Sequence, residues 1–407
     1  MTNAWRHGIF AGCTVLSACG AGGEPELVRP PHEDDAGVDG SGGQRPDAGI
    51  QDADVDVSDA VVSTDAPVSP VRVGIVPVPA STEDAGPSPV DRTAALLDVL
   101  GAGARATTLV YRWDELTDDL GNPRAEVFGA LESWATLHRD AGRSLLLSIA
   151  LVDRTRDARP SALRGSSWDG VLVEAAARRL VDEAFTHFGS ELVFLSFGNE
   201  VDRYLGRASA SQGEAFVRLA QHLLDHARAS SARPSALRVG VTLSVEALVA
   251  ASDANAALIS ASDVVVASYL PREDGVRPPA PSAPATDLVA LLSSLAVDGG
   301  PTPPIVLQQV GYPSASEVGS SPEAQRSFFD SLFQTVAGHR EQFPFVSVYA
   351  LHDLAGQACS MEVEAYALAS DPNAEAFFCS VGLRTASGAP KSAWNAVLGA
   401  LATFHDP

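Results

Sequence analysis

The chain has 407 residues, of which 45% are hydrophobic, so it can bury a large apolar core. Its formal net charge of −23 argues against attraction to nucleic acid or to an anionic membrane surface. The four cysteines fall into two pairs whose spacing fits no zinc site, and we expect neither a metal nor a cofactor.

Residues 1–18 have the pattern of a bacterial signal peptide. A short basic start containing Arg6 precedes an apolar stretch that is too short to span a bilayer. The sequence LSAC at residues 16–19 resembles the lipoprotein box, in which the cysteine is lipidated and becomes the mature N-terminus. The resemblance implies a lipid anchor at Cys19 and an extracytoplasmic protein, held to a bacterial membrane in the periplasm or at the cell surface. The alternative is an ordinary signal peptide in which Cys19 is incidental.

Residues 19–70 are predicted to carry the lipidated cysteine on a disordered acidic tether. Residues 20–70 contain twelve acidic and two basic side chains, many glycines and prolines, and no aromatic residue. Such a segment cannot bury enough apolar surface to offset the entropy lost on ordering it. Repulsion between like charges should keep it extended.

From residue 71 onwards, short apolar runs alternate with helical segments. Eight such runs predict strands at residues 71–79, 106–113, 143–152, 191–197, 236–245, 263–270, 303–313 and 343–351. Strands that are apolar throughout suit a sheet covered on both faces. We therefore expect one α/β domain over residues 71–407, a (β/α)₈ TIM barrel. A doubly wound open sheet is the alternative, disfavoured because no glycine-rich phosphate loop follows the first strand.

Polar and aromatic side chains stand where the predicted strands end, which is where such barrels place their sites. Carboxylates, amides and aromatic rings in one mouth suit a sugar, because rings stack on aromatics while hydroxyl groups bond to acids and amides. The residues at these ends are Arg112, Trp113, Asp153, Asn199, Glu200, Glu246, Tyr269, Gln308, Gln309, Tyr312 and Asp353.

Two of these ends resemble a known family. Asn199-Glu200 after the fourth strand is similar to the acid/base site of the large clan of retaining (β/α)₈ glycoside hydrolases that includes endo-β-galactanases and β-glucanases. The stretch QQVGYPSA at 308–315 is similar to their seventh-strand motif, and VGLRTASGAPKSAWNAV at 381–397 to their common ending. The resemblance implies that Glu200 is the proton donor, that Asn199 binds a sugar hydroxyl, and that Gln309 occupies the nucleophile position.

The departure from the family is at Gln309, where those enzymes have a glutamate. A retaining glycosidase needs two carboxyl groups about 5–5.5 Å apart, one of them an ionised nucleophile, and an amide is neutral and a poor nucleophile. We therefore predict a carbohydrate-binding protein with lost or weakened hydrolysis. One alternative is an active glycosidase in which Glu200 works with a substitute carboxylate, which would be Glu246, Asp353 or Asp153. The other is a non-catalytic scaffold for protein contacts.

The expected ligand is a polysaccharide or an oligosaccharide, bound by a monomer without nucleic acid. Its further contacts are expected from Arg112, Trp113, Tyr269, Tyr312 and Asp353. Structural roles compete with each assignment, because Arg112 could pair with Glu200 and the aromatic rings could pack in the rim.

Cys359 and Cys379 flank a long loop after the eighth strand. Outside the cytoplasm a disulfide is the default expectation, and closing a loop of this length stabilises by about 3 kcal/mol in the chain-entropy model. Two free thiols are the alternative. The loop also contains Glu362, Glu364 and Asp371, and we expect it to form one wall of the cleft.

Overall fold

A computed structural model of the chain describes residues 70–80, 89–250, 252–273, 275–296 and 302–404. The chain divides into two units, Met1–Ala66 and Pro67–Pro407, and the described residues all belong to the second. The predicted signal peptide, lipidation site and tether therefore lie outside the described residues, and their boundaries remain predictions. Within the described part, no helix combines the length and the hydropathy needed to cross a bilayer.

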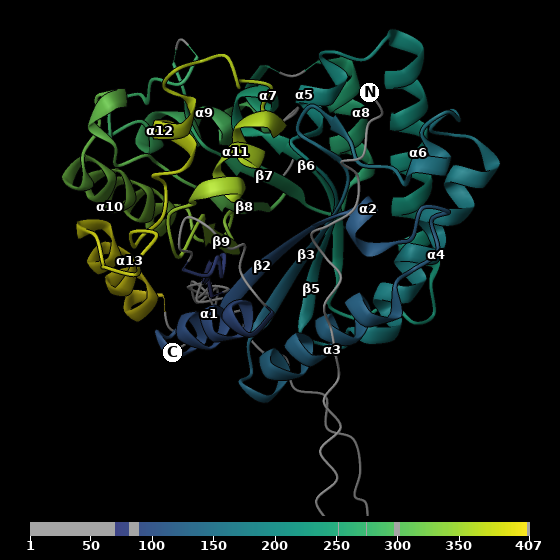
Figure 1. Ribbon diagram of the computed structural model, residues 1–407, viewed down its shortest axis with the longest axis horizontal. Helices are drawn as coiled ribbons and strands as arrows, with labels where there is room; N and C mark the ends of the chain where they lie inside the picture. Colours follow the sequence, from purple (N-terminus) through teal and green to yellow (C-terminus); the bar gives the residue numbers. More distant parts are fainter. Residues whose placement is uncertain (1–69, 81–88, 251, 274, 297–301, 405–407) are drawn as a thin grey trace, which may run out of the picture. The chain divides into compact units, whose positions relative to one another are not determined.

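Eight parallel strands close into a barrel (Figure 1). They are β1 (Arg72–Ile75), β2 (Ala106–Arg112), β3 (Ser144–Asp153), β5 (Leu192–Asn199), β6 (Arg238–Ser244), β7 (Val265–Tyr269), β8 (Ile305–Val310) and β9 (Phe345–Val348). Strand β1 pairs with β2 and β9, and the pairing of β2 with β3 completes the ring. The two-residue strand β4 (Arg156–Asp157) adds antiparallel to β3. The predicted (β/α)₈ barrel is confirmed, and the open-sheet alternative is wrong.

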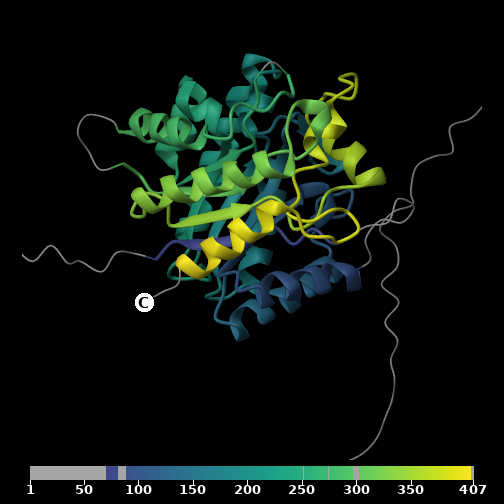
Figure 2. The same cartoon turned by 90° about the vertical axis from the view of Figure 1, so that its left-hand side faces the viewer.

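Helices surround the barrel, and each long one buries an apolar face against it (Figures 1 and 2). The long helices are α1 (Pro89–Gly101), α3 (Ala125–Asp140), α4 (Val171–His187), α6 (Ala210–Ala229), α8 (Asp253–Ala261), α9 (Pro284–Leu295), α10 (Pro322–Gly338) and α13 (Ser392–Thr403). Helix α6 shows why they form: the Ser209 side chain accepts from the Gln212 amide at its start, and Phe216, Leu219 and Leu223 recur at helical spacing and are buried. Shorter helices α2 (Trp113–Leu116), α5 (Val201–Leu205) and α7 (Val245–Ala250) follow directly on strands β2, β5 and β6.

The barrel interior changes from apolar to polar along the strands. Its first layers hold an apolar cluster in which Phe194 and Phe345 meet edge to face at 5.4 Å between ring centroids. On β5, Ser196 lies two residues after Phe194, and on β8, Gln308 lies two residues after Val306 of the same cluster. Ser196 and Gln308 are both buried. Because side chains two apart in a strand share a face, these polar groups form the next layer towards the carboxyl ends. The barrel thus directs its hydrogen-bonding groups to the end where the site was predicted.

The segment after β9, predicted as a loop, contains helices α11 (Gly356–Ala365) and α12 (Ala374–Phe378) (Figure 1). The predicted disulfide between Cys359 and Cys379 is confirmed. Val363, Tyr366 and Phe378 of this segment pack in an apolar cluster that also includes residues from the ends of the barrel strands. The segment is helical because its apolar side chains pack against the barrel, and such tertiary contacts stabilise short helices.

Candidate functional site

The chain turns sharply as β5 ends, and this turn presents Glu200. Gly198 and Glu200 both have positive φ angles, 77° and 47°. A side chain at Gly198 would bring its Cβ within 2.3 Å of a Val201 methyl group, so only glycine fits there. A left-handed glutamate is uncommon, and such residues cluster at functional sites. The positive φ angles of Gly198 and Glu200 thus fix the orientation of the Asn199-Glu200 pair at the end of β5.

The Glu200 carboxylate is buried and fully occupied. The side chain is 1% exposed and forms an ion pair with Arg203, one turn further along α5. Its Oε1 atom also accepts from Ser268 Oγ at 2.9 Å and from the Tyr366 hydroxyl at 2.6 Å. Burial favours the neutral acid, but the guanidinium groups of Arg203 and Arg154 outweigh it and hold the pKa of Glu200 at about 2, against an ordinary 4.5. Glu200 is therefore an anion at physiological pH.

Arg112 does not pair with Glu200, so that alternative is wrong. Arg112 instead binds two carboxylates that follow it in the sequence, Asp114 at 3.0 Å and Glu115 at 2.8 Å. Its guanidinium group thus holds the turn from β2 into α2.

Asn199 is the centre of a network of buried side chains. Its Nδ2 donates to Asp153 Oδ1 at 3.0 Å, and its Oδ1 accepts from Gln308 Nε2 at 3.3 Å. Gln308 Oε1 in turn accepts from the Thr242 hydroxyl at 2.8 Å. Four strands are joined in this way, β3, β5, β6 and β8. Gln308 therefore has a structural role as a cross-link inside the barrel.

Gln309 is the strand partner of Ser268, which contacts Glu200. The register of β7 and β8 shifts after Ala267, so that Ser268 pairs with Gln309. Paired residues of neighbouring parallel strands face the same side, and Ser268 donates to Glu200. Gln309 is buried, and its Oε1 has no hydrogen-bond partner in the described structure. The structure thus brings the predicted acid and the amide to one end of the barrel.

Helix α11 lies across the mouth and contacts these residues. Tyr366, at its end, is buried and donates to Glu200. The guanidinium carbon of Arg154 lies 4.6 Å from the centroid of the Tyr366 ring, and that of Arg272 lies 4.7 Å from it. Arg154 also forms ion pairs with Asp153, at 2.8 Å, and with Glu362 of α11. The segment expected to form one wall of a cleft therefore fills the mouth.

Glu362 has an unusual pKa for a carboxyl group. Burial raises it, the Arg154 charge opposes this, and the charges of Asp153 and Glu200 add to the rise, so that it reaches about 7. The pKa values of these two buried glutamates are thus shifted in opposite directions. The shift favours the anion of Glu200 and the neutral acid of Glu362.

The predicted aromatic contacts are not brought to Glu200. The Tyr269 hydroxyl donates to Asp287 of α9 at 2.7 Å, and its ring stacks on Phe328 of α10. The Tyr312 ring stacks on the same Phe328 at 4.6 Å between centroids. Trp113 is fully buried in the core. These rings pack between barrel and helices, because alternation along β7 turns Tyr269 outwards where Ser268 faces in.

The three candidate substitute carboxylates differ in position. Asp153 belongs to the Asn199 network and is bonded to Arg154. Asp353 forms an ion pair with Lys391 at 2.6 Å and also accepts from the Gly382 amide. Glu246 is exposed in the first turn of α7. Of the three, only Asp153 bonds directly to a residue of the predicted site.

Sequence reasoning missed four residues that contact or surround Glu200: Arg154, Arg203, Ser268 and Tyr366. Arg203 stands one helical turn after Glu200 and could have been found from that spacing. The other three come from distant parts of the chain, and Tyr366 is 166 residues away from Glu200 in sequence.

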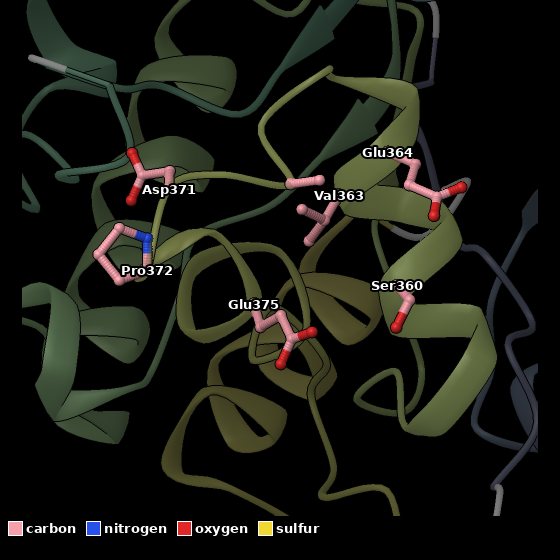
Figure 3. Close-up of a pocket in the computed structure, with 7 residues that line it drawn as sticks. Ser360, Val363, Glu364, Asp371, Pro372 and Glu375 are labelled. Atoms are coloured by element: carbon pink, nitrogen blue, oxygen red, sulfur yellow. The ribbon is translucent and has the colours of Figure 1, made fainter.

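A hollow of about 340 Å³ lies on the α11–α12 segment (Figure 3). Its lining includes the carboxylates Glu364, Asp371 and Glu375. None of the residues that contact Glu200 lines it.

The closed eight-stranded barrel, with polar side chains at its carboxyl end, defines a (β/α)₈ barrel protein. No family model and no curated protein matches the sequence. The chain is similar to the solved structure of GH5_18 from Bifidobacterium longum subsp. longum, with a TM-score of 0.64 and 14% identity over 83% of this chain and 80% of that one. GH5_18 from Streptomyces cattleya, in complex with GlcNAc, gives a TM-score of 0.61 and 16% identity over 84% and 82%. Another structure of the Bifidobacterium protein, a variant, contains Manβ1-4GlcNAc. At these identities the likeness establishes the fold.

Proposed function

We propose that this chain is an extracytoplasmic, lipid-anchored protein whose barrel binds a saccharide, with glycoside hydrolysis lost or weakened. Carbohydrate as the ligand class is supported by the Asn199-Glu200 pair at the end of β5 and by the sugars in the similar structures. Lipidation at Cys19 is supported by the LSAC sequence. Buried acyl methylenes would contribute about 0.8 kcal/mol each to membrane attachment.

The observation that carries the loss of hydrolysis is the state of Glu200. A glycosidase acid must hold a proton to give to the leaving group, so its pKa is normally raised. Arginines hold the pKa of Glu200 at about 2. At pH 7 Glu200 is then almost entirely ionised. Glu200 is held as an ion-pair partner and is poorly suited to donate a proton.

The second half of the catalytic pair fails for a different reason. The amide of Gln309 cannot attack a sugar carbon and cannot place negative charge beside a developing oxocarbenium ion. The loss of one such preorganised interaction typically slows a reaction by roughly 10²-fold or more. The pair that the resemblance implies, Glu200 and Gln309, thus supplies neither a proton donor nor a nucleophile, and we expect turnover below detection.

Two measurements test the proposal on the full chain. Binding is measured by calorimetry with Manβ1-4GlcNAc and on a glycan array. Hydrolysis is followed by product analysis over long incubations. We expect binding that is lost in Asn199→Ala and kept in the control Asn395→Ala, whose side chain is exposed on α13, together with no product. Absence of binding to every glycan would favour the protein-interaction scaffold. Turnover that disappears in Glu200→Gln would establish an active glycosidase with a substitute carboxylate.

The variant Gln309→Glu separates the two catalytic defects. If the nucleophile alone were missing, this change would restore some turnover. We expect none, because Glu200 stays ionised by Arg203 and Arg154. Measurable hydrolysis by Gln309→Glu would show that the state of Glu200 is not the limiting defect.

A further inference from the structure

We infer that the segment from α11 to α12 is a removable plug, in which Tyr366 occupies on Glu200 the place of a sugar, and that it must leave the mouth before a saccharide binds. The inference rests on the proposed saccharide binding and adds a regulated entrance to it.

The hydroxyl group of Tyr366 makes the contact with Glu200 that is expected of a bound sugar. Its hydroxyl donates to Glu200 at 2.6 Å, as a sugar hydroxyl would. Its ring stacks on Phe378 at 4.2 Å between centroids, with an interplanar angle of 16°. Phe378 belongs to α12, so this stacking holds Tyr366 in place within the segment itself. Tyr366 is 4% exposed and Glu200 is 1% exposed, so a saccharide cannot reach Glu200 while Tyr366 stays.

The plug is attached to the barrel by polar contacts and by the apolar cluster that it shares with residues at the strand ends. Besides the bond from Tyr366, Glu362 pairs with Arg154, and the Ala365 carbonyl accepts from both the amide and the hydroxyl of Thr155, at 3.2 and 3.0 Å. Polar contacts can be exchanged for contacts with water when the segment moves. The plug adds no strand to the barrel sheet, so its movement breaks no strand pairing.

The plug is also a closed unit with adjacent ends. The Leu354 amide donates to the Cys379 carbonyl at 3.2 Å, so the segment enters and leaves the barrel at one place. Cys359 and Cys379 are joined by the disulfide, which ties α11 to the end of α12. Gly356, at the start of α11, has a φ of 51°, a conformation that glycine adopts easily. A loop with adjacent ends and its own packing can swing as a body.

Carboxylate footprinting tests the plug without any sugar. The full chain is treated at pH 6 with a carbodiimide and glycine ethyl ester, and labelling is read by mass spectrometry. Glu191 is the matched control, because its side chain is also 1% exposed and paired with an arginine, Arg139, at the opposite end of β5. Opening of the plug exposes Glu200 and leaves Glu191 protected, whereas unfolding of the barrel exposes both.

We expect Cys359→Ser/Cys379→Ser to raise labelling of Glu200 at least tenfold, with Glu191 unchanged. Tyr366→Ala should do the same and should bind Manβ1-4GlcNAc at least tenfold more tightly than the parent chain. Protection of Glu200 in both variants would overturn the plug, and so would labelling of Glu200 only together with Glu191. Equal affinity of Tyr366→Ala and the parent for the disaccharide also counts against it. If neither chain binds any glycan, the proposed function fails, while the footprint still decides whether the segment opens.

Discussion

The stability of the variant Glu200→Gln shows whether Glu200 serves as a structural ion-pair partner or as a catalytic acid. Glutamine keeps the size of the side chain, so the change removes the charge and little else. At a catalytic site such a change often stabilises the protein, because active sites hold strained or unsatisfied groups. Here the carboxylate has three partners, Arg203, Ser268 and Tyr366, and we expect the opposite.

The magnitude follows from the pKa of Glu200. Its value in the folded protein is about 2, against 4.5 for an ordinary glutamate. At 1.36 kcal/mol for each pKa unit, the ionised side chain stabilises the fold by on the order of 3 kcal/mol at pH 7. Because the folded pKa is depressed, this contribution is present above pH 4.5 and is lost as the pH falls towards 2. The difference between the parent and Glu200→Gln should therefore shrink as the pH falls.

The assay is guanidinium unfolding at pH 7.0 and at pH 3.0, followed by the fluorescence of the buried tryptophans Trp113 and Trp168. We expect Glu200→Gln to lower the free energy of unfolding by about 3 kcal/mol at pH 7.0, with an unchanged denaturant slope, and by clearly less at pH 3.0. A Glu200→Gln chain as stable as its parent at pH 7.0 would refute the reasoning. A loss of equal size at both pH values would also refute it.

Three further predictions test other parts of the chain. Burial raises the pKa of Glu362 to about 7, so the melting temperature of the parent chain should fall as the pH rises from 5.5 to 8. Glu362→Gln should make the melting temperature depend less on pH over this range. An unchanged pH dependence in Glu362→Gln would contradict the prediction. Lys391→Met leaves the half-buried Asp353 without its cation, which should lower the free energy of unfolding by about 3 kcal/mol at pH 7. The loss should be smaller at pH 4, where Asp353 can take up a proton. Equal melting temperatures of the variant and the parent at pH 7 would contradict this prediction. Cys19→Ser, expressed in a bacterium, should abolish incorporation of labelled palmitate and release the chain from membranes; continued labelling would exclude Cys19 as the anchor.

The barrel could be predicted from the sequence because its signals are local. Each of the eight apolar runs overlaps an observed strand, and the helical spacing between them sets the alternation of strands with helices. The disulfide was also predictable, since Cys359 and Cys379 flank one segment of a chain expected outside the cytoplasm. The end of β5 was recognisable for the same reason, because Asn199 and Glu200 interrupt an apolar strand.

The tertiary structure alone decided what surrounds Glu200. A strand pattern does not say which neighbour a residue faces. Of Ser268 and Tyr269 at the end of the sixth predicted strand, Tyr269 was chosen as the contact, although Tyr269 packs outwards and Ser268 bonds to Glu200. Arg203 rather than Arg112 became the partner of Glu200 because α5 continues directly from β5. Tyr366 comes from a segment remote in sequence, and its contact depends on how α11 packs across the strand ends. Local periodicity specifies elements, whereas the filling of the mouth depends on long-range packing that no single window of sequence contains.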